Sequence, residues 1–368
     1  MEWYSIKNAE TLDTPALVIY PDRVKRNIDL LKTFVSDPSQ LRPHVKTNKC
    51  PQVCRLMLEA GITKFKSATI AETEMLAGEG APDVLLAYQP TGPKARRFCE
   101  LILKFPKTVF SCLIDNRKSL LELSAAAKQY QLNVRVFVDL NVGMNRTGIK
   151  PGKEVVDLYL EAAKTKGIEI AGLHIYDGHL RDTDISVRRQ KCDAAFAPVN
   201  NLKKEIAEAT GKIPVVVAGG TPTFPIHAKR KDVEASPGTF IFWDSGYQQL
   251  LPEQPFEFAA LVVSRVISIP DEETICLDLG HKSIASENPI TNRVYLLNAP
   301  DLQPIGHSEE HMVFRARKNH GHEVGDVLYG VPNHICPTVA LYDEAAVCRE
   351  NTIETTWPIL ARRRKISV

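Results

Sequence analysis

The feature that most constrains the fold is an alternation of short β-rich runs with helix-like segments over the first two thirds of the chain. The β-rich runs cover residues 41–46, 64–68, 83–88, 108–114, 134–140, 168–176, 213–220 and 232–238. Strands that alternate with helices form a parallel sheet, because each helix returns the chain to the start of the next strand. Eight such units within about 225 residues predict a closed (β/α)8 barrel of the TIM type.

The sequence changes character near residue 250. Residues 249–368 contain strand-like runs separated by turn residues and lack long helical periods, which predicts a second, β-rich domain. The barrel is expected to begin at "ALVIY", residues 16–20. We therefore predict an α/β chain with a barrel at 16–248 and a β-rich domain made of 1–15 and 249–368.

Composition excludes several classes of protein. The 368 residues are 44% hydrophobic and carry a formal net charge of +2, so neither a nucleic acid nor a membrane is expected as a partner. No apolar run reaches the roughly 18 residues that a membrane span requires. The N-terminus lacks the pattern of a secretory signal, and the eight cysteines are irregularly spaced, so we expect a cytoplasmic protein without a disulfide framework.

Lys46 ends the first β-rich run, within the motif "RPHVKTNK". The carboxyl ends of barrel strands form the reactive face, so Lys46 is expected to point, partly desolvated, into the mouth of the barrel. Desolvation favours a neutral amine, which can attack an aldehyde. For a single lysine, a solvated position in a loop is the alternative.

Glycines and hydroxyl residues follow the seventh and eighth β-rich runs. They are Gly219, Gly220, Thr221, Gly238 and Thr239. Glycine leaves backbone N–H groups open to an anion, and barrels of this class often bind a phosphate at these two loops. After the fifth run, Gly143 and Gly148 flank Arg146, which is expected to reach back into the mouth. A nucleophilic lysine beside a phosphate site indicates pyridoxal phosphate.

These motifs resemble those of the fold-type III pyridoxal-phosphate enzymes, and within them the D-threonine aldolase and D-serine dehydratase group. The resemblance implies that Lys46 binds the cofactor covalently and is catalytic, and that Arg146 contacts the cofactor's phenolic oxygen. It also implies that the loops around "GGTPT" and "SPGTF" bind the phosphate. "IYDGH", residues 175–179, is similar to the segment that places Tyr176 near the cofactor and His179, as a catalytic residue, at the mouth.

Two positions depart from the patterns of related enzymes. Asn48 stands where the group commonly has histidine, which leaves an acid–base role at that position in doubt. Ser236 stands where alanine racemases, which share the barrel, have an arginine against the pyridine nitrogen. Without that cation the cofactor ring is a stronger electron sink, which disfavours a racemase.

The second domain contains the motif "PNHICPT". On an extended strand His334 and Cys336 would point to the same side, and an imidazole with a thiolate suits Zn²⁺. A core cysteine beside a turn histidine is the alternative from the residues alone. The resemblance implies a divalent cation at this motif, which we expect to be zinc, with manganese or magnesium as alternatives.

The resemblance implies a pyridoxal-phosphate- and metal-dependent lyase that acts on D-3-hydroxy amino acids. Aldol cleavage and dehydration use the same groups, so both reactions stay open. The expected partners are a small D-amino acid substrate and a second copy of the chain in a homodimer. An amino-acid racemase and a non-catalytic pyridoxal-phosphate-binding protein are the alternatives.

Overall fold

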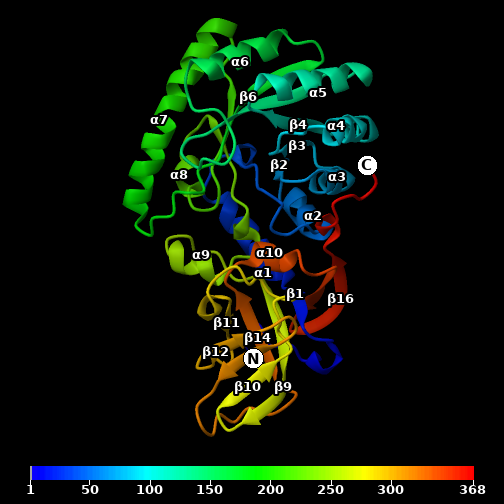
Figure 1. The fold of residues 1–368 in the computed structure, drawn as a ribbon, viewed down its shortest axis with the longest axis vertical. Helices are drawn as coiled ribbons and strands as arrows, with labels where there is room; N and C mark the ends of the chain where they lie inside the picture. The colour runs from blue at the N-terminus through cyan, green and yellow to red at the C-terminus, as the bar shows by residue number, and fades with distance from the viewer. Residues whose placement is uncertain (1) are drawn as a thin grey trace. The chain divides into compact units, whose positions relative to one another are not determined.

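The structure, a computed structural model, describes residues 2–368 (Figure 1). The chain divides into two compact units. The β-rich unit contains the residues up to Leu30, together with Thr47–Val53 and Thr239–Arg362. The α/β unit contains Leu31–Lys46, Cys54–Gly238 and Arg363–Val368.

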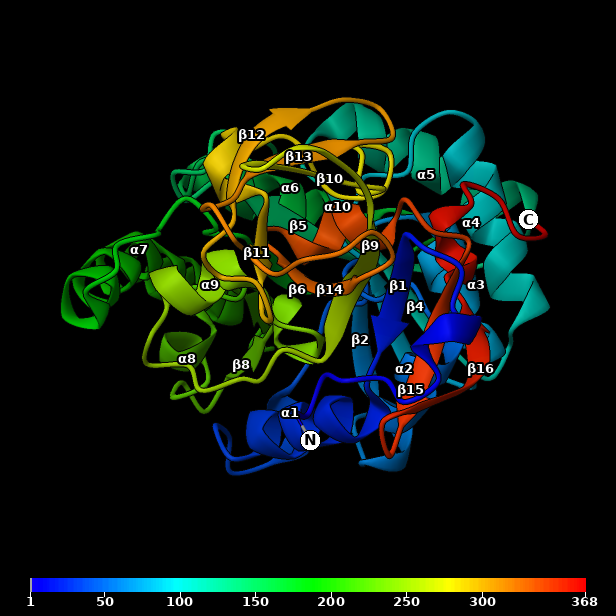
Figure 2. The ribbon, with the colours of Figure 1, turned by 90° about the horizontal axis from the view of Figure 1, so that it is seen from below.

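A seven-stranded parallel sheet forms the centre of the α/β unit, and each strand pairs with the next one along the chain. The strands are β2 (Lys64–Ser67), β3 (Asp83–Leu86), β4 (Val109–Ile114), β5 (Val134–Leu140), β6 (Ile168–Ile175), β7 (Val215–Ala218) and β8 (Val233–Ala235). The helices that alternate with them are α3 (Ile70–Gly78), α4 (Pro93–Lys104), α5 (Arg117–Gln129), α6 (Lys153–Lys164), α7 (Ile185–Thr210) and α8 (Phe224–His227). Figures 1 and 2 show α3 to α6 on the outside of this sheet, which confirms the predicted α/β class.

Local sequence signals begin and end these helices. The side chain of Thr69 accepts a hydrogen bond from the backbone of Glu72, and the Glu72 carboxylate accepts one from Ala68, so two N–H groups at the start of α3 are satisfied. Helix α7 begins after Asp184, whose side chain accepts from backbone N–H groups, and ends at Gly211 with φ of +70°. Glycine adopts this left-handed backbone conformation at little cost in free energy, because it has no Cβ.

The prediction of a closed eight-stranded barrel is wrong, because the sheet has seven strands and stays open. Residues 41–46 make isolated bridges instead of a regular strand, with Leu41 opposite Ala235 and His44 opposite Lys66. Pro43 lies between the two bridges and has no N–H group to donate. The segment still hydrogen-bonds to residues on both sides, since Lys66 donates to the carbonyl of Pro43 and Arg42 donates to that of Ala235, but Pro43 interrupts the regular ladder.

The β-rich unit contains a nine-stranded sheet. Its strands are β1 (Ala16–Ile19), β9 (Ala260–Asp271), β10 (Thr274–Leu277), β11 (Val294–Leu296), β12 (Gln303–His307), β13 (Met312–Arg315), β14 (Val327–Pro332), β15 (Glu344–Arg349) and β16 (Thr352–Pro358). Most of them follow the order β12-β13-β10-β9-β1-β15-β16, and β14 pairs with both β9 and β11. The remaining α-helices of the chain are α1 (Pro21–Lys32), α2 (Pro51–Glu59), α9 (Ser245–Leu250) and α10 (Ile335–Val339).

Strand β1 differs from the expectation that the barrel begins at residue 16. It pairs antiparallel with β9 and parallel with β15, so it lies inside the sheet of the β-rich unit. An apolar run such as "ALVI" carries no information about which sheet it joins, since its pairing partners are more than 200 residues away.

Each unit has its own apolar core. Inside the α/β sheet, Leu85, Leu113, Phe137 and Val217 pack together from four strands. Below them, toward the amino ends of the strands, the guanidinium of Arg42 is 1% exposed and pairs with Asp83 and Glu234 at 2.6 Å each. The core of the β-rich unit includes Ile275 and Phe314. Within residues 2–368, no helix combines the length and apolar character needed to cross a bilayer.

Candidate active site

Lys46 is the last residue of its segment of the α/β unit and follows the bridge between His44 and Lys66. The backbone N–H of Val45 donates to the carbonyl of Lys66 at 2.9 Å, which orders the chain up to Lys46. The Lys46 side chain is exposed. The predicted partial desolvation of this amine is therefore wrong for this structure, whereas its place at the carboxyl edge of the sheet agrees with the prediction.

The loop after β5 folds back on itself and carries Arg146. The Asn141 side chain accepts hydrogen bonds from the backbone of Gly143 and Asn145, at 3.1 and 3.0 Å. Gly148 has φ of +93° and lies so near the end of β5 that an added Cβ would be 2.6 Å from the backbone of Leu140. Only glycine fits such an approach, so the two glycines that flank Arg146 in the sequence do shape this loop.

The side chain of Tyr176 is held between Arg146 and two glycines. The guanidinium carbon of Arg146 lies 4.5 Å from the centre of the Tyr176 ring. An added Cβ on Gly220 would be 2.9 Å from the Tyr176 ring, and one on Gly178 would be 2.1 Å from its hydroxyl oxygen. Three of the predicted cofactor residues, Arg146, Tyr176 and Gly220, are thus brought together within the α/β unit.

His179 lies at the same end of the sheet. Its side chain is exposed, and an added Cβ on Gly143 would be 2.7 Å from its Nε2 atom. The loops that follow β5 and β6 therefore contact each other at His179, at the carboxyl edge where the sequence predicted a catalytic histidine.

The loops after β7 and β8 meet. The backbone N–H of Gly238 donates to the hydroxyl of Thr221 at 3.3 Å, and Thr221 is 5% exposed. Gly219 has φ of +87°, which turns the chain so that Gly220 and Thr221 follow at the edge of the sheet. Thr239, 4% exposed, is the first residue of the next segment of the β-rich unit. Backbone N–H groups and buried hydroxyls at two adjoining loops fit a phosphate group.

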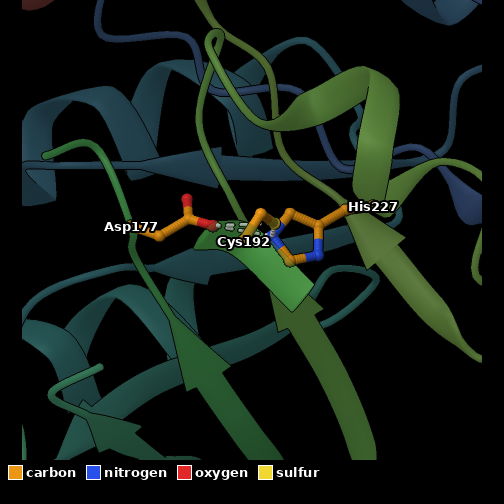
Figure 3. Close-up of side chains that lie close together, drawn as sticks. All are labelled: Asp177, Cys192 and His227. Atoms are coloured by element: carbon orange, nitrogen blue, oxygen red, sulfur yellow. Dashed lines mark hydrogen bonds and ion pairs between the residues drawn. The ribbon is translucent and has the colours of Figure 1, made fainter. Parts of the chain in front are cut away.

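A buried cluster supports the loop after β7: Asp177, Cys192 and His227 (Figure 3). Asp177 accepts hydrogen bonds from the hydroxyl of Thr223 at 2.5 Å and from Nε2 of His227 at 2.8 Å. Thr223 in turn accepts from the backbone N–H of Gly220 at 3.3 Å. The cluster therefore fixes the backbone of the loop through Asp177.

The ligand atoms of this cluster are close enough for a metal, but its hydrogen bonds do not suit one. A guanidinium can only donate, so Arg230 donates to Nδ1 of His227 at 3.3 Å, and Nε2 carries the hydrogen that faces Asp177. Burial, followed by the charge of Asp177, raises the pKa of the Cys192 thiol to about 12. A protonated nitrogen and a protonated thiol are poor ligands.

The motif of His334 and Cys336 is not extended, contrary to the sequence prediction. Strand β14 ends at Pro332, His334 occupies the N-cap position of helix α10 without a capping side-chain hydrogen bond, and Cys336 lies in the first turn of that helix. The two side chains are nevertheless hydrogen-bonded to each other. The hydroxyls of Thr47 and Thr239 lie 3.1 and 3.7 Å from the sulfur of Cys336.

The chemistry of this pair fits a divalent ion. Nδ1 of His334 lies 2.5 Å from Oε1 of Glu287, which leaves Nε2 as the ligand atom and orients the ring, as in many metal sites. Burial alone would lower the pKa of His334, but the side chain of Cys336, followed by Glu287 and Asp244, raises it to about 9. The hydrogen bond between His334 and Cys336 therefore marks the place where a cation could bind both side chains.

Sequence reasoning missed three buried polar residues at the carboxyl ends of the strands: Lys66, Asp139 and His174. Lys66 is 2% exposed, and its amine lies 3.4 Å from the carbonyl of Gly219. Nδ1 of His174 lies 2.7 Å from Asp139, and no group within residues 2–368 hydrogen-bonds to the buried Nε2 of His174. The alternation of lysines in "KFKS" was the available signal, since Lys64 and Lys66 must share one side of β2.

The two positions that depart from related patterns are both buried. The hydroxyl of Ser236 donates to the carbonyl of Arg42 at 2.7 Å. The side chain of Asn48 accepts from the backbone N–H of Cys50 at 3.1 Å. Both side chains therefore bind backbone groups.

Two family models together match most of the chain. One is described as alanine racemase, N-terminal domain, and matches residues 19–246. The other, for a serine dehydratase domain, matches residues 259–348.

Several full-length relatives are known enzymes. A D-threonine aldolase from Arthrobacter sp is 26% identical, over 95% of this chain and 93% of that protein. A 3-hydroxy-D-aspartate aldolase from Paracoccus denitrificans is 26% identical, over 95% of this chain and 92% of its own. The crystal structure of D-threonine aldolase from Filomicrobium marinum aligns with a TM-score of 0.87 and 25% identity, over 98% of both chains.

A dehydratase is also among the relatives. The D-threo-3-hydroxyaspartate dehydratase of Delftia sp. HT23 is 24% identical, over 94% of this chain and 97% of that protein. A cysteine-to-alanine mutant of that dehydratase, in its metal-free form, aligns with a TM-score of 0.78 and 23% identity, over 95% of this chain and 98% of that one.

Proposed function

The chain belongs to the family of the alanine racemase N-terminal domain, and from this premise we propose that it is a pyridoxal-phosphate- and divalent-metal-dependent lyase acting on D-3-hydroxy amino acids. The full-length aldolases and the dehydratase support a lyase because they resemble both units, whereas the family model alone would equally suit a racemase.

The observation that carries the proposal is the pairing of His334 with Cys336. Glu287 orients the imidazole, and the thiol lies beside the hydroxyl of Thr47, the residue that follows Lys46 in the chain. A racemase has no use for a bound cation, whereas a lyase that acts at a β-hydroxyl does. A metal-free cysteine mutant exists for the related dehydratase, which supports a metal role for Cys336.

When bound, pyridoxal phosphate supplies an electron sink for charge at Cα, and a divalent ion supplies a Lewis acid for the β-oxygen. We assign covalent attachment of the cofactor, and movement of the proton at Cα, to the amine of Lys46. Tyr176 and Arg146 flank the cofactor site in the α/β unit, and His179 holds or moves a proton at its edge.

The phosphate is assigned to the loops after β7 and β8. The residues are Gly219, Gly220, Thr221, Gly238 and Thr239. His334 and Cys336 are assigned to the metal, and the soft thiolate favours zinc over manganese or magnesium.

A product assay tests the proposal and separates its two reactions. The protein is incubated with D-threonine, D-serine and 3-hydroxy-D-aspartate, with and without a chelator. Aldol cleavage releases glycine and an aldehyde, whereas dehydration releases a keto acid and ammonia. Neither product from any of the three substrates, or D-to-L conversion that survives the chelator, would exclude the lyase and favour the racemase.

Two further parts of the proposal have their own tests. A homodimer is expected from the enzyme class, and sedimentation velocity at assay concentration measures it; an active monomer contradicts it. A reducing, cytoplasmic setting is supported by the cysteines, none of which forms a disulfide within residues 2–368. Localisation of a tagged chain tests that setting.

A further inference from the structure

Lys66 is a buried amine without an ion-pair partner. It is 2% exposed, and within residues 2–368 no carboxylate lies within 4 Å of its nitrogen. Buried lysines are rare unless they are paired. Lys64, two residues earlier on the same side of β2, has the ordinary arrangement, since it pairs with Glu234 at 2.5 Å.

The bridge between His44 and Lys66 brings Lys66 near the proposed cofactor lysine. His44 pairs in parallel with Lys66, and Lys46 follows two residues later, in the turn that begins at Val45. The charge of Lys46 contributes to lowering the pKa of Lys66, as expected for two amines that are neighbours in space.

The amine of Lys66 also contacts the phosphate loop. It lies 3.4 Å from the carbonyl of Gly219, the residue whose positive φ turns the chain toward Gly220 and Thr221. The loop therefore offers backbone N–H groups to an anion. The carbonyl of Gly219 in the same loop accepts a hydrogen bond from the buried amine of Lys66.

Charges of both signs surround Lys66. Burial lowers its pKa to about 7; the charges of Lys46 and Arg146 act in the same direction, and those of Asp177 and Asp139 oppose them. His174, the other buried titratable group here, has a pKa lowered by burial, so it does not supply a positive charge near neutral pH.

We propose that Lys66 is the switchable positive charge of the phosphate site, which binds the Gly219 carbonyl and attracts the dianion of the cofactor when it is protonated. The inference rests on the proposed function, because that function identifies the anion as the phosphate of pyridoxal phosphate. It adds a binding residue to that site and a dependence of cofactor affinity on pH.

The direction of the dependence follows from linkage. A bound dianion favours the protonated amine, so it raises the pKa of Lys66 above its value of about 7 in the anion-free protein. Anion affinity is then highest below pH 7 and falls as the pH rises through the interval between the two pKa values. A rise of one unit corresponds to about a ten-fold loss of affinity.

Inorganic sulfate is the probe, because its charge stays constant between about pH 6 and about pH 9. Its affinity for the cofactor-free full chain is measured by calorimetry, and competition with pyridoxal phosphate identifies the site. We expect wild-type affinity to fall about ten-fold over this range, with proton uptake on binding near pH 7.5. In Lys66→Met the affinity should be low at every pH, and in Lys66→Arg it should be high at every pH, because arginine stays charged.

Lys64→Met is the matched control, since it removes a lysine from the same side of the same strand and should keep the wild-type dependence. A pH dependence that persists in Lys66→Met, or sulfate that does not compete with pyridoxal phosphate, overturns the inference. Failure of the proposed function would be detected separately. In that case, wild-type protein mixed with pyridoxal phosphate would not show the absorbance of a lysine-bound cofactor, and this result does not depend on how sulfate binds.

Discussion

Nδ1 of His334 lies 2.5 Å from Oε1 of Glu287, whereas Nδ1 of the buried His227 accepts from the guanidinium of Arg230. The first arrangement leaves Nε2 of His334 as the atom that would bind a cation, and the second puts a hydrogen on Nε2 of His227. The first arrangement therefore suits a metal ligand, and the second suits a structural residue.

Glu287→Gln should weaken divalent-metal binding by about 10- to 100-fold, because the carboxylate orients His334 and increases its basicity. The measurement is metal affinity by competition with a chromophoric chelator. Glu272→Gln, at a largely exposed carboxylate, is the control. Equal metal affinity in the two variants would mean that Glu287 does not support a ligand.

Cys336→Ala should abolish most turnover and leave the absorbance of the lysine-bound cofactor intact. The reason is that Cys336 belongs to the β-rich unit, while Lys46, Arg146 and the first phosphate loop belong to the α/β unit. Chelator treatment of the wild type should reproduce this phenotype, and added zinc should reverse it only in the wild type. Full lyase activity of metal-free protein would show that the metal has no role.

Borohydride reduction followed by peptide mapping should find the cofactor on Lys46 and not on Lys66. The amine of Lys46 is exposed, whereas that of Lys66 is 2% exposed and bound to the carbonyl of Gly219. In Lys46→Ala no reduced adduct is expected. Recovery of the label on Lys66 would reverse the assignment of the two lysines.

Gly220→Ala should weaken the binding of pyridoxal phosphate by at least about ten-fold, because the added Cβ would be 2.9 Å from the Tyr176 ring, and relieving such overpacking costs about 1–3 kcal/mol. Gly78→Ala is the control, since nothing lies within 4 Å of its added Cβ. Cofactor affinity is read from the lysine-bound absorbance, and unfolding by urea shows whether each variant is folded. Unchanged affinity in Gly220→Ala would place the cofactor elsewhere.

His174 should make the protein less stable in mild acid. Burial lowers its pKa below the ordinary 6.5, so the unfolded chain takes up a proton first as the pH falls. Its contribution is present above the ordinary pKa of 6.5 and is lost as the pH falls below that value. Urea unfolding at pH 7.5 and 5.5 should therefore show a smaller acid loss for His174→Gln than for the wild type, while His311→Gln, at an exposed histidine, should match the wild type. A loss as large in His174→Gln as in the wild type would assign acid sensitivity to other groups.

The sequence by itself determined the features that depend on neighbouring residues. Alternating strands and helices predicted a parallel α/β sheet, because hydrophobic period and helix caps are local signals. The glycines around Arg146 predicted tight backbone turns, and both Gly143 and Gly148 have positive φ. The assignment of the phosphate to the loops after β7 and β8 also came from local residues, since an anion site made of backbone N–H groups favours residues without a Cβ, and it stays a prediction.

Only the tertiary structure decided what depends on distant parts of the chain. Strand β1 joined a sheet whose other strands begin more than 200 residues later, and Pro43 left the α/β sheet with seven strands. The metal motif became a helix cap, yet His334 and Cys336 still meet. The burial of the two lysines could not be predicted from a motif: the sequence motif pointed to Lys46, which is exposed, whereas Lys66 on β2 is buried. The burial of an amine depends on all the groups that surround it in the folded chain, so a short motif cannot show which lysine is desolvated.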